Sequence, residues 1–179
     1  QGNTDKKYIG QHENPPLSDK GRLELEEKKS RNLYPRAEAL YTSPLLRCME
    51  TAQMLYPMLV PVQLPSLMEQ DFGAFEGKTY EQLKENPAYR RWIDTAGMVP
   101  PPGGESAGEF TQRLSGALQK IRDDALSAHF KSAAVITHGG CIMTILSHLA
   151  DNSMSSPTAF YGFQASNGGG YTAILDTHS

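Results

Sequence analysis

The sequence predicts a single α/β domain in which helices cover both faces of a mainly parallel sheet. Predicted strands and helices alternate along the chain, which is typical of folds built on a parallel sheet. Residues 133–137 form a short, continuously apolar run, as in strands that are buried on both faces. The chain has 179 residues, 39% of them hydrophobic, and can therefore bury one substantial core.

The first part of the chain is expected to contain two helices and two strands. Ser18 is the predicted N-cap of a charged helix whose charges form a solvated face. Residues 39–42 form a short strand. Ser43 then acts as an N-cap, and a proline at the first helical position starts a helix over residues 44–56. Residues 60–64 are the second predicted strand.

The middle of the chain is predicted to be irregular and then helical. Residues 69–78 have no regular pattern, and short helices follow over residues 81–96. After a loop rich in proline and glycine, Ser106 and Glu109 form a capping box that starts a long helix. The apolar residues of this helix recur at helical spacing and are assigned to the core: Phe110, Leu114, Ala117, Ile121 and Ala125.

The C-terminal part adds the apolar strand over residues 133–137 and a helix over residues 141–150. Two further strands are predicted over residues 160–165 and 171–175. The glycines of residues 166–170 could cradle a phosphate, but no helix start follows them. We therefore interpret that segment as the turn between the two strands.

The composition excludes several classes of protein. A formal net charge of -3 provides no basic field, so we expect no nucleic acid partner. The two cysteines, Cys48 and Cys141, form no Cys-x-x-Cys pair, which favours the reducing cytoplasm over a disulfide framework or a cysteine-based metal site. No apolar run approaches the roughly 20 residues that span a bilayer, and no secretory leader is visible. No membrane partner is therefore expected.

Two strand-to-helix junctions are the expected site of chemistry, one leading to Arg47 and the other containing His138. Both fall at the carboxyl ends of parallel strands, and each presents a helix N-terminus that favours an anion. Arg47 adds a planar fork of donors that matches phosphate oxygens. Taken singly, Arg47 would be a surface ion-pair residue and His138 a structural histidine. Their coincidence favours a phosphate site.

A third element, residues 67–77, places carboxylates among aromatic residues and glycines. A carboxyl group held near apolar rings has a raised pKa and can act as a general acid near neutral pH. Glu69 is the candidate for this role. The alternative is a turn with exposed acidic side chains.

These segments resemble the histidine phosphatase superfamily, which includes phosphoglycerate mutases and α-ribazole phosphatases. Residues 42–52 are similar to the family's Ser-Ser-x-Leu-x-Arg-x-x-x-Thr-Ala helix, and residues 67–77 to its Leu-x-Glu-x-x-Phe-Gly-x-x-Glu-Gly segment. Residues 102–106 resemble its Pro-Gly-Gly-Glu-Ser loop, and residues 137–140 its Ser-His-Gly-Gly turn. The motifs follow the family's order over nearly the whole chain.

The resemblance implies a phosphoglycerate mutase-like fold, a three-layer α/β/α sandwich, and a mechanism without metal or cofactor. In the family, a histidine of an Arg-His-Gly motif at the end of the first strand attacks phosphorus. The resemblance assigns Arg47 to the phosphate cradle, Glu69 to protonation of the leaving oxygen, and His138 to stabilisation of the equatorial oxygens. The substrate-binding residues that it implies are Asn3, Ile9, Gly10, Arg47 and Gly139.

The sequence departs from the family pattern at its beginning, because no Arg-His-Gly motif occurs in it. On one register, Asn3 and residues 8–10 continue the pattern without a gap, and the nucleophile lies upstream of Gln1. On the other, Gln1 stands in the place of the nucleophile and a short deletion is needed. We favour the first register. The expectation is one domain over residues 1–179 that lacks its first strand.

The leading functional prediction is a phosphatase that acts on a small phosphorylated metabolite through a phosphohistidine, with α-ribazole 5'-phosphate as a candidate. The interval between Gly77 and Gly104 is short and lacks the basic insert of the mutases. Phosphoglycerate mutase is the first alternative, and a non-catalytic phosphoryl-binding protein is the second. A homodimer is compatible with the sequence.

Substrate specificity is assigned to a segment that is expected to cap the site. It contains aromatic residues beside a basic pair, which could grip an extended or nucleotide-like substrate. The alternative is a pair of helices that packs its aromatic rings inward. The residues concerned are Tyr80, Tyr89, Arg90, Arg91 and Trp92.

Overall fold

The centre of the fold is a sheet of three parallel strands. The computed structural model describes residues 6–149 and 157–174. The strands are β1 (Ala39–Thr42), β2 (Val62–Gln63) and β3 (Ala133–Ile136), and their order in the sheet is β2-β1-β3. Thr42 of β1 lies opposite Gln63 on one side and opposite Ile136 on the other. The carboxyl ends of all three strands therefore lie at the same edge of the sheet.

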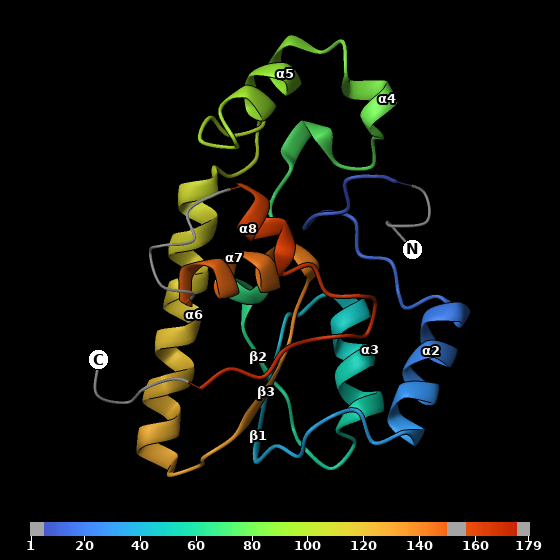
Figure 1. Ribbon diagram of the computed structural model, residues 1–179, viewed down its shortest axis with the longest axis vertical. Coiled ribbons are helices and arrows are strands. Elements are labelled where there is room, and N and C mark those ends of the chain that lie inside the picture. Colours follow the sequence, from blue (N-terminus) through green and yellow to red (C-terminus); the bar gives the residue numbers. More distant parts are fainter. Residues whose placement is uncertain (1–5, 150–156, 175–179) are drawn as a thin grey trace.

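Helices cover both faces of this sheet, as the sequence predicted. Figure 1 shows α6 and α3 on opposite sides of the strands, with α2 packed outside α3. The helices are α2 (Asp19–Ser30), α3 (Leu46–Leu55), α4 (Tyr80–Leu83), α5 (Pro87–Asp94), α6 (Ala107–Ala128), α7 (Gly139–Leu149) and α8 (Pro157–Gly162). Two 3-10 turns, η1 (Pro65–Leu67) and η2 (Gly73–Phe75), connect β2 to α4. None of the helices in the described part of the chain is long and apolar enough to cross a membrane.

The main core lies between the sheet and α6. Tyr41, from the middle of β1, packs against the apolar stripe of α6 and against Cys141 of α7. The stripe is the predicted one: Phe110, Leu114, Ala117 and Ile121 are buried, and Ala125 is half-buried. The predicted capping box of Ser106 and Glu109 is also confirmed. This packing fixes α6 against one face of the sheet.

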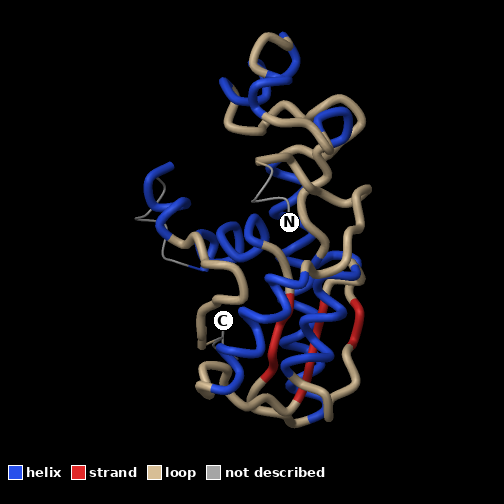
Figure 2. The backbone as a smooth tube through the Cα atoms, turned by 90° about the vertical axis from the view of Figure 1, so that its right-hand side faces the viewer, coloured by secondary structure: helices blue, strands red, loops and turns tan. Residues whose placement is uncertain are grey.

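A second apolar cluster forms a cap over the carboxyl ends of the strands. Figure 2 shows this cap, built from η2, α4 and α5, as a group of short helices and loops at one end of the molecule. The ring of Tyr89 is 2% exposed and lies edge-on to the ring of Phe75, and the hydroxyl groups of Tyr8 and Tyr89 lie 2.6 Å apart. The aromatic rings thus pack inward.

The start of α3 differs from the prediction. The helix begins at Leu46 and not at Pro44, and its N-cap residue Leu45 makes no side-chain cap. Asn14 supplies the cap from a distant loop, because its Oδ1 accepts the N–H of Leu46 at 2.7 Å. The predicted cap, Ser43, instead accepts the N–H of Leu45 at 3.3 Å and bonds to a histidine of the site. The sequence prediction of Ser43 as the helix cap was wrong for this reason.

The burial of β3 also differs from the prediction. All four residues of β3 are half-buried and not fully buried. Within the described residues, β3 pairs with β1 on one side, and no strand pairs with its other edge. An edge strand shares its apolar side chains and backbone groups with solvent, which explains the exposure.

The two predicted C-terminal strands are not found in the described residues. Residues Pro157–Gly162 form α8 and residues 163–165 form no strand, so the strand prediction for residues 160–165 was wrong. Residues 171–174 have no regular structure, and Ile174 is 96% exposed. A strand forms only where a neighbouring strand pairs its backbone groups, and no such partner stands beside this segment in residues 6–149 and 157–174. Residue 175 of that prediction lies outside the described residues.

Candidate functional site

The candidate site lies at the carboxyl ends of β1 and β3, where Ser43 and His138 leave the sheet. The His138 ring is 7% exposed, and its Nε2 lies 2.8 Å from the hydroxyl oxygen of Ser43. Arg47, in the first turn of α3, donates its Nε–H to the Nδ1 of His138 at 3.2 Å. Because Nδ1 accepts this bond, the ring proton resides on Nε2 and is donated to Ser43. The ring is therefore neutral.

The charge state of His138 follows from its surroundings. Burial, and after it the positive charges of Arg47 and Arg113, together lower the pKa of His138 to about 3. A neutral imidazole beside a permanently charged guanidinium gives the site one fixed positive charge from Arg47.

Arg47 is held by the loop that precedes α2. Its Nη2 donates to the carbonyl oxygen of Gly10 at 3.1 Å, and its Nη1 donates to that of Glu13 at 3.3 Å. Gly10 has no room for a side chain, since a Cβ would lie 2.2 Å from Glu76 Oε1 and 2.4 Å from the carbonyl oxygen of Gln70. The guanidinium plane is thus fixed between the loop and the His138 ring.

Glu69 approaches the same place from the segment after η1. Its carboxylate accepts the backbone N–H of Gly140 at 3.1 Å and that of Gln70 at 2.9 Å. The N–H of Gly140 is one of the free donors at the N-terminus of α7. The contact depends on glycine, because a Cβ at residue 140 would lie 2.4 Å from Glu69 Oε1.

The pKa of Glu69 is raised above its ordinary value. Burial is the main cause, and it outweighs the two backbone N–H donors and the charges of Arg47 and Arg113, all of which favour the carboxylate. A carboxyl group with a raised pKa can hold a proton closer to neutral pH and give it to a departing oxygen.

The two thiols near the site do not compete as nucleophiles. Cys48 Sγ lies 3.5 Å from His138 Nε2, and burial raises the pKa of Cys48 to about 12. Burial also raises the pKa of Cys141, whose Sγ donates to the carbonyl oxygen of Met68 at 3.1 Å. Thiolates are the reactive form of cysteine, so both groups are inert at neutral pH.

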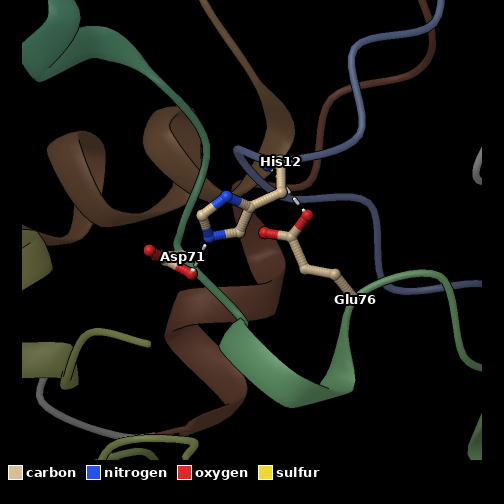
Figure 3. A group of neighbouring side chains, drawn as sticks. All are labelled: His12, Asp71 and Glu76. Atoms are coloured by element: carbon tan, nitrogen blue, oxygen red, sulfur yellow. Dashed lines mark hydrogen bonds and ion pairs between the residues drawn. The ribbon is translucent and has the colours of Figure 1, made fainter. Parts of the chain in front are cut away.

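A second group of side chains, drawn in Figure 3, holds the loop whose carbonyl groups accept the hydrogen bonds of Arg47. The carboxylate of Glu76 accepts the backbone N–H groups of Gln11, His12 and Glu13 at 2.8, 2.9 and 3.2 Å. The His12 ring lies 3.2 Å from Asp71 Oδ1. His12, Asp71 and Glu76 are close enough to share a metal ion, with ligand atoms within 4.8 Å of one another. However, both oxygens of Glu76 already accept backbone donors, so we interpret the group as a loop clamp.

The clamp leads to a testable prediction for Glu76→Gln. The amide nitrogen of glutamine cannot accept a hydrogen bond, so at least one of the three backbone donors loses its partner. An unsatisfied, partly buried donor costs about 1–3 kcal/mol, and amide hydrogen exchange should accelerate at residues 11–13. Urea unfolding and exchange followed by mass spectrometry measure both effects. Glu27→Gln, on the exposed face of α2, is the matched control, and equal stabilities of the two variants would contradict the clamp.

Comparison with known proteins identifies the family. The family model described as histidine phosphatase superfamily (branch 1) matches residues 1–169. The chain belongs to the histidine phosphatase superfamily.

The proteins similar to this superfamily member are named for different activities. A bifunctional protein of Mycobacterium tuberculosis is 30% identical over 121 residues, which are 65% of this chain and 29% of the relative. The chain thus spans less than a third of that relative. The α-ribazole phosphatase of Shigella flexneri has the same fold, with a TM-score of 0.79 at 21% identity over 94% of this chain and 82% of that one. A phosphoglycerate mutase of Thermus thermophilus is 28% identical, with a TM-score of 0.67 over 84% of this chain and 78% of that one.

In this histidine phosphatase superfamily member, the structure brings together most of the residues that the sequence singled out. Arg47, Glu69 and His138 converge, and the carbonyl group of Gly10 joins them. Gly139 is the first residue of α7, beside His138, and Ile9 is half-buried next to Gly10. Asn3 lies outside the described residues.

The cap residues follow the alternative in which the rings pack inward. Tyr89 and Trp92 belong to the apolar cluster, and Arg90 forms an ion pair with Glu85 of the same segment. Tyr80 is 57% exposed. Arg91 lines a groove of about 500 Å³ between α5 and residues 99–104.

Three features of the site were missed from the sequence. Ser43 was predicted to be a helix cap, whereas its hydroxyl group bonds to His138. Asn14 lies in an irregular loop, where no local pattern connects it to α3. Arg113 stands on α6 between the buried positions Phe110 and Leu114, and a cation beside an apolar stripe was a signal that could have indicated a buried partner.

Proposed function

We propose that this protein is a phosphomonoesterase that hydrolyses a small phosphorylated metabolite through a phosphohistidine intermediate. The observation that supports it is the convergence of Arg47, His138 and Glu69 at the carboxyl ends of β1 and β3. This arrangement combines a fixed guanidinium fork, a neutral imidazole and a carboxyl group with a raised pKa. Phosphoryl transfer needs positioning and charge stabilisation of this kind more than covalent chemistry from the protein.

Each residue has a role in the two steps of the reaction, phosphoryl transfer to a histidine and hydrolysis of the phosphohistidine. A histidine nitrogen attacks phosphorus, the bond from phosphorus to the ester oxygen breaks, and Glu69 gives its proton to the departing alkoxide. Water then attacks the phosphohistidine, Glu69 takes a proton from it, and the phosphorus–nitrogen bond breaks. Arg47 donates to the equatorial oxygens, whose negative charge is spread in the transition state, and His138 joins it when its Nε2–H turns from Ser43 to the phosphoryl group.

The attacking histidine is proposed to lie on a strand upstream of Gln1 that pairs with the open edge of β3. Neighbouring strands lie about 4.8 Å apart, so the carboxyl end of such a strand would stand beside His138, which follows β3 by two residues. The half-buried apolar residues of β3 would be covered by the same pairing.

The test is rapid quenching of the full-length protein with p-nitrophenyl phosphate. We expect a burst of p-nitrophenol and a phosphoenzyme that is labile in acid and stable in alkali, as phosphohistidine is. A phosphoenzyme with the opposite stability, or turnover without a burst and without trapped phosphate, argues against the proposal. Binding of vanadate without any turnover would favour a phosphoryl-binding protein.

The proposed substrate is α-ribazole 5'-phosphate, a phosphate ester with an extended organic group. Support comes from the small cap, in which α4 and α5 have four and eight residues, and from the shared fold with an α-ribazole phosphatase. Phosphoglycerate mutase activity is the second candidate because of the similarity to the Thermus protein. Hydrolysis of α-ribazole 5'-phosphate should exceed that of 3-phosphoglycerate. A phosphoenzyme that survives until 3-phosphoglycerate accepts its phosphoryl group would indicate the mutase.

A further inference from the structure

Arg113 uses every N–H donor of its guanidinium group to hold the segment that carries Glu69. Its Nη1 donates to the carbonyl oxygens of Ser66 and Met68 at 2.9 and 2.8 Å, and its Nη2 donates to that of Glu69 at 2.9 Å. The two remaining donors bind Glu105, at 2.8 Å from Nε and 2.6 Å from Nη2. An arginine has five such donors, and all are satisfied here.

Glu105 holds the same segment from its other end. Its Oε1 accepts the backbone N–H of Asp71 at 2.8 Å, and its own N–H donates to the carbonyl oxygen of Asp71 at 3.0 Å. The side chains of Arg113 and Glu105 are 21% and 14% exposed, so solvent competes little for these bonds. The pair therefore fixes the backbone on both sides of Glu69.

We propose that Arg113, oriented by Glu105, is a positioning residue that aims the Glu69 carboxyl group at the departing oxygen. The inference rests on the proposed role of Glu69 as the general acid. Proton transfer depends on heavy-atom separations of about 2.6–3.2 Å, and among the described residues two backbone donors define the place of the Glu69 carboxylate. Its aim is consequently set by the backbone that Arg113 holds.

A guanidinium group is needed for this task, and a positive charge alone is insufficient. The planar guanidinium group of Arg113 donates at once to the carbonyl oxygens of three residues and to one carboxylate. Lysine keeps the charge but has three donors on one atom and no planar geometry. Arg113→Lys therefore separates the geometric contribution of Arg113 from its charge.

The experiment compares two substrates with different leaving groups in the full-length protein. Phenyl phosphate has a poor leaving group that needs a proton, whereas p-nitrophenyl phosphate has a good one that needs little help. We expect Arg113→Lys to lower kcat/KM, which reports only the first phosphoryl transfer, about 10-fold for phenyl phosphate and far less for p-nitrophenyl phosphate, because misplacement of a catalytic group by about 1 Å is costly. Glu69→Gln should show the same bias, and the double variant should be no slower on phenyl phosphate than Glu69→Gln alone.

Two further variants control the result. Arg22→Lys alters a comparable arginine-to-carboxylate pair, with 2.7 Å between Arg22 and Glu50 on the other side of the sheet, and should change neither rate. Glu105→Gln weakens the Arg113–Glu105 pair while leaving Arg113 in place. It should show a smaller bias toward loss of activity on phenyl phosphate. It keeps the test usable if Arg113→Lys folds poorly.

The outcomes separate the two ideas. Equal loss on both substrates in Arg113→Lys and Glu105→Gln would show that the Arg113–Glu105 pair is merely structural and overturn the positioning role. Additive effects in the double variant would do the same. If Glu69→Gln itself shows no bias toward the poor leaving group, the acid role of Glu69 fails, and the positioning role fails with it.

Discussion

Arg47→Ala is expected to lower kcat/KM of the full-length protein for phosphomonoesters by about 100-fold or more, the usual effect of deleting one fixed donor to a transition-state oxygen. The variant removes the guanidinium group that we propose binds the phosphoryl group, and it leaves the Nδ1 of His138 and the carbonyl oxygen of Gly10 without their donor. Steady-state kinetics measure the loss, and inhibition by orthovanadate measures the accompanying loss of anion affinity.

Arg47→Lys and Arg22→Ala complete this comparison. Lysine restores the charge without the fork, so we expect an intermediate rate. Arg22 pairs with Glu50 on the outer side of α3, away from the site, and its replacement should leave kcat/KM unchanged. A rate for Arg47→Ala close to that of Arg22→Ala would show that Arg47 does not bind the phosphoryl group.

Glu69→Gln is expected to lower kcat/KM for phenyl phosphate by about 100-fold or more, within the range that general acid catalysis supplies. Glutamine has nearly the same shape and can still accept the N–H of Gly140, but it has no acidic proton to give. The loss in kcat/KM, which reports only the first phosphoryl transfer, should be much smaller for p-nitrophenyl phosphate. Comparison of kcat/KM for the two substrates measures the proton transfer to the leaving group, and equal losses would assign Glu69 to another role.

The pH dependence supplies an independent check of Glu69. Its pKa is raised by burial, so the active, protonated form is present below that pKa and disappears as the pH rises through it. We therefore expect kcat/KM for phenyl phosphate to fall on the alkaline side, and this fall should be absent in Glu69→Gln. A parallel fall in both proteins would indicate that another group titrates.

Local sequence patterns predicted the parts of this structure that depend on local chemistry. The capping box at Ser106, the buried stripe of α6 and the convergence of Arg47 with His138 all follow from spacing within one segment or from strand ends that meet at one edge. The first two features require no knowledge of which distant segment lies alongside, and the third requires only that β1 and β3 are parallel neighbours.

The features that the sequence did not predict depend on distant partners. Asn14 caps α3 from another loop, and the backbone of Glu69 is held by Arg113, which is more than forty positions further along the chain. The burial of β3 was overestimated because an apolar run does not reveal whether one neighbouring strand or two will pair with it. These features are determined by which distant segments pack together, and the hydrophobic periodicity of one segment does not show this.

The neutral state of His138 links the binding of an anion to the uptake of a proton. In the structure, burial and two arginines hold the pKa of this ring at about 3. A phosphate dianion placed against the ring raises that pKa, because an opposite charge favours the imidazolium form. Between the pKa values of the empty and the occupied site, affinity for the anion rises as the pH falls. For a phosphoryl ligand bound as we propose, loss of that proton would weaken its binding.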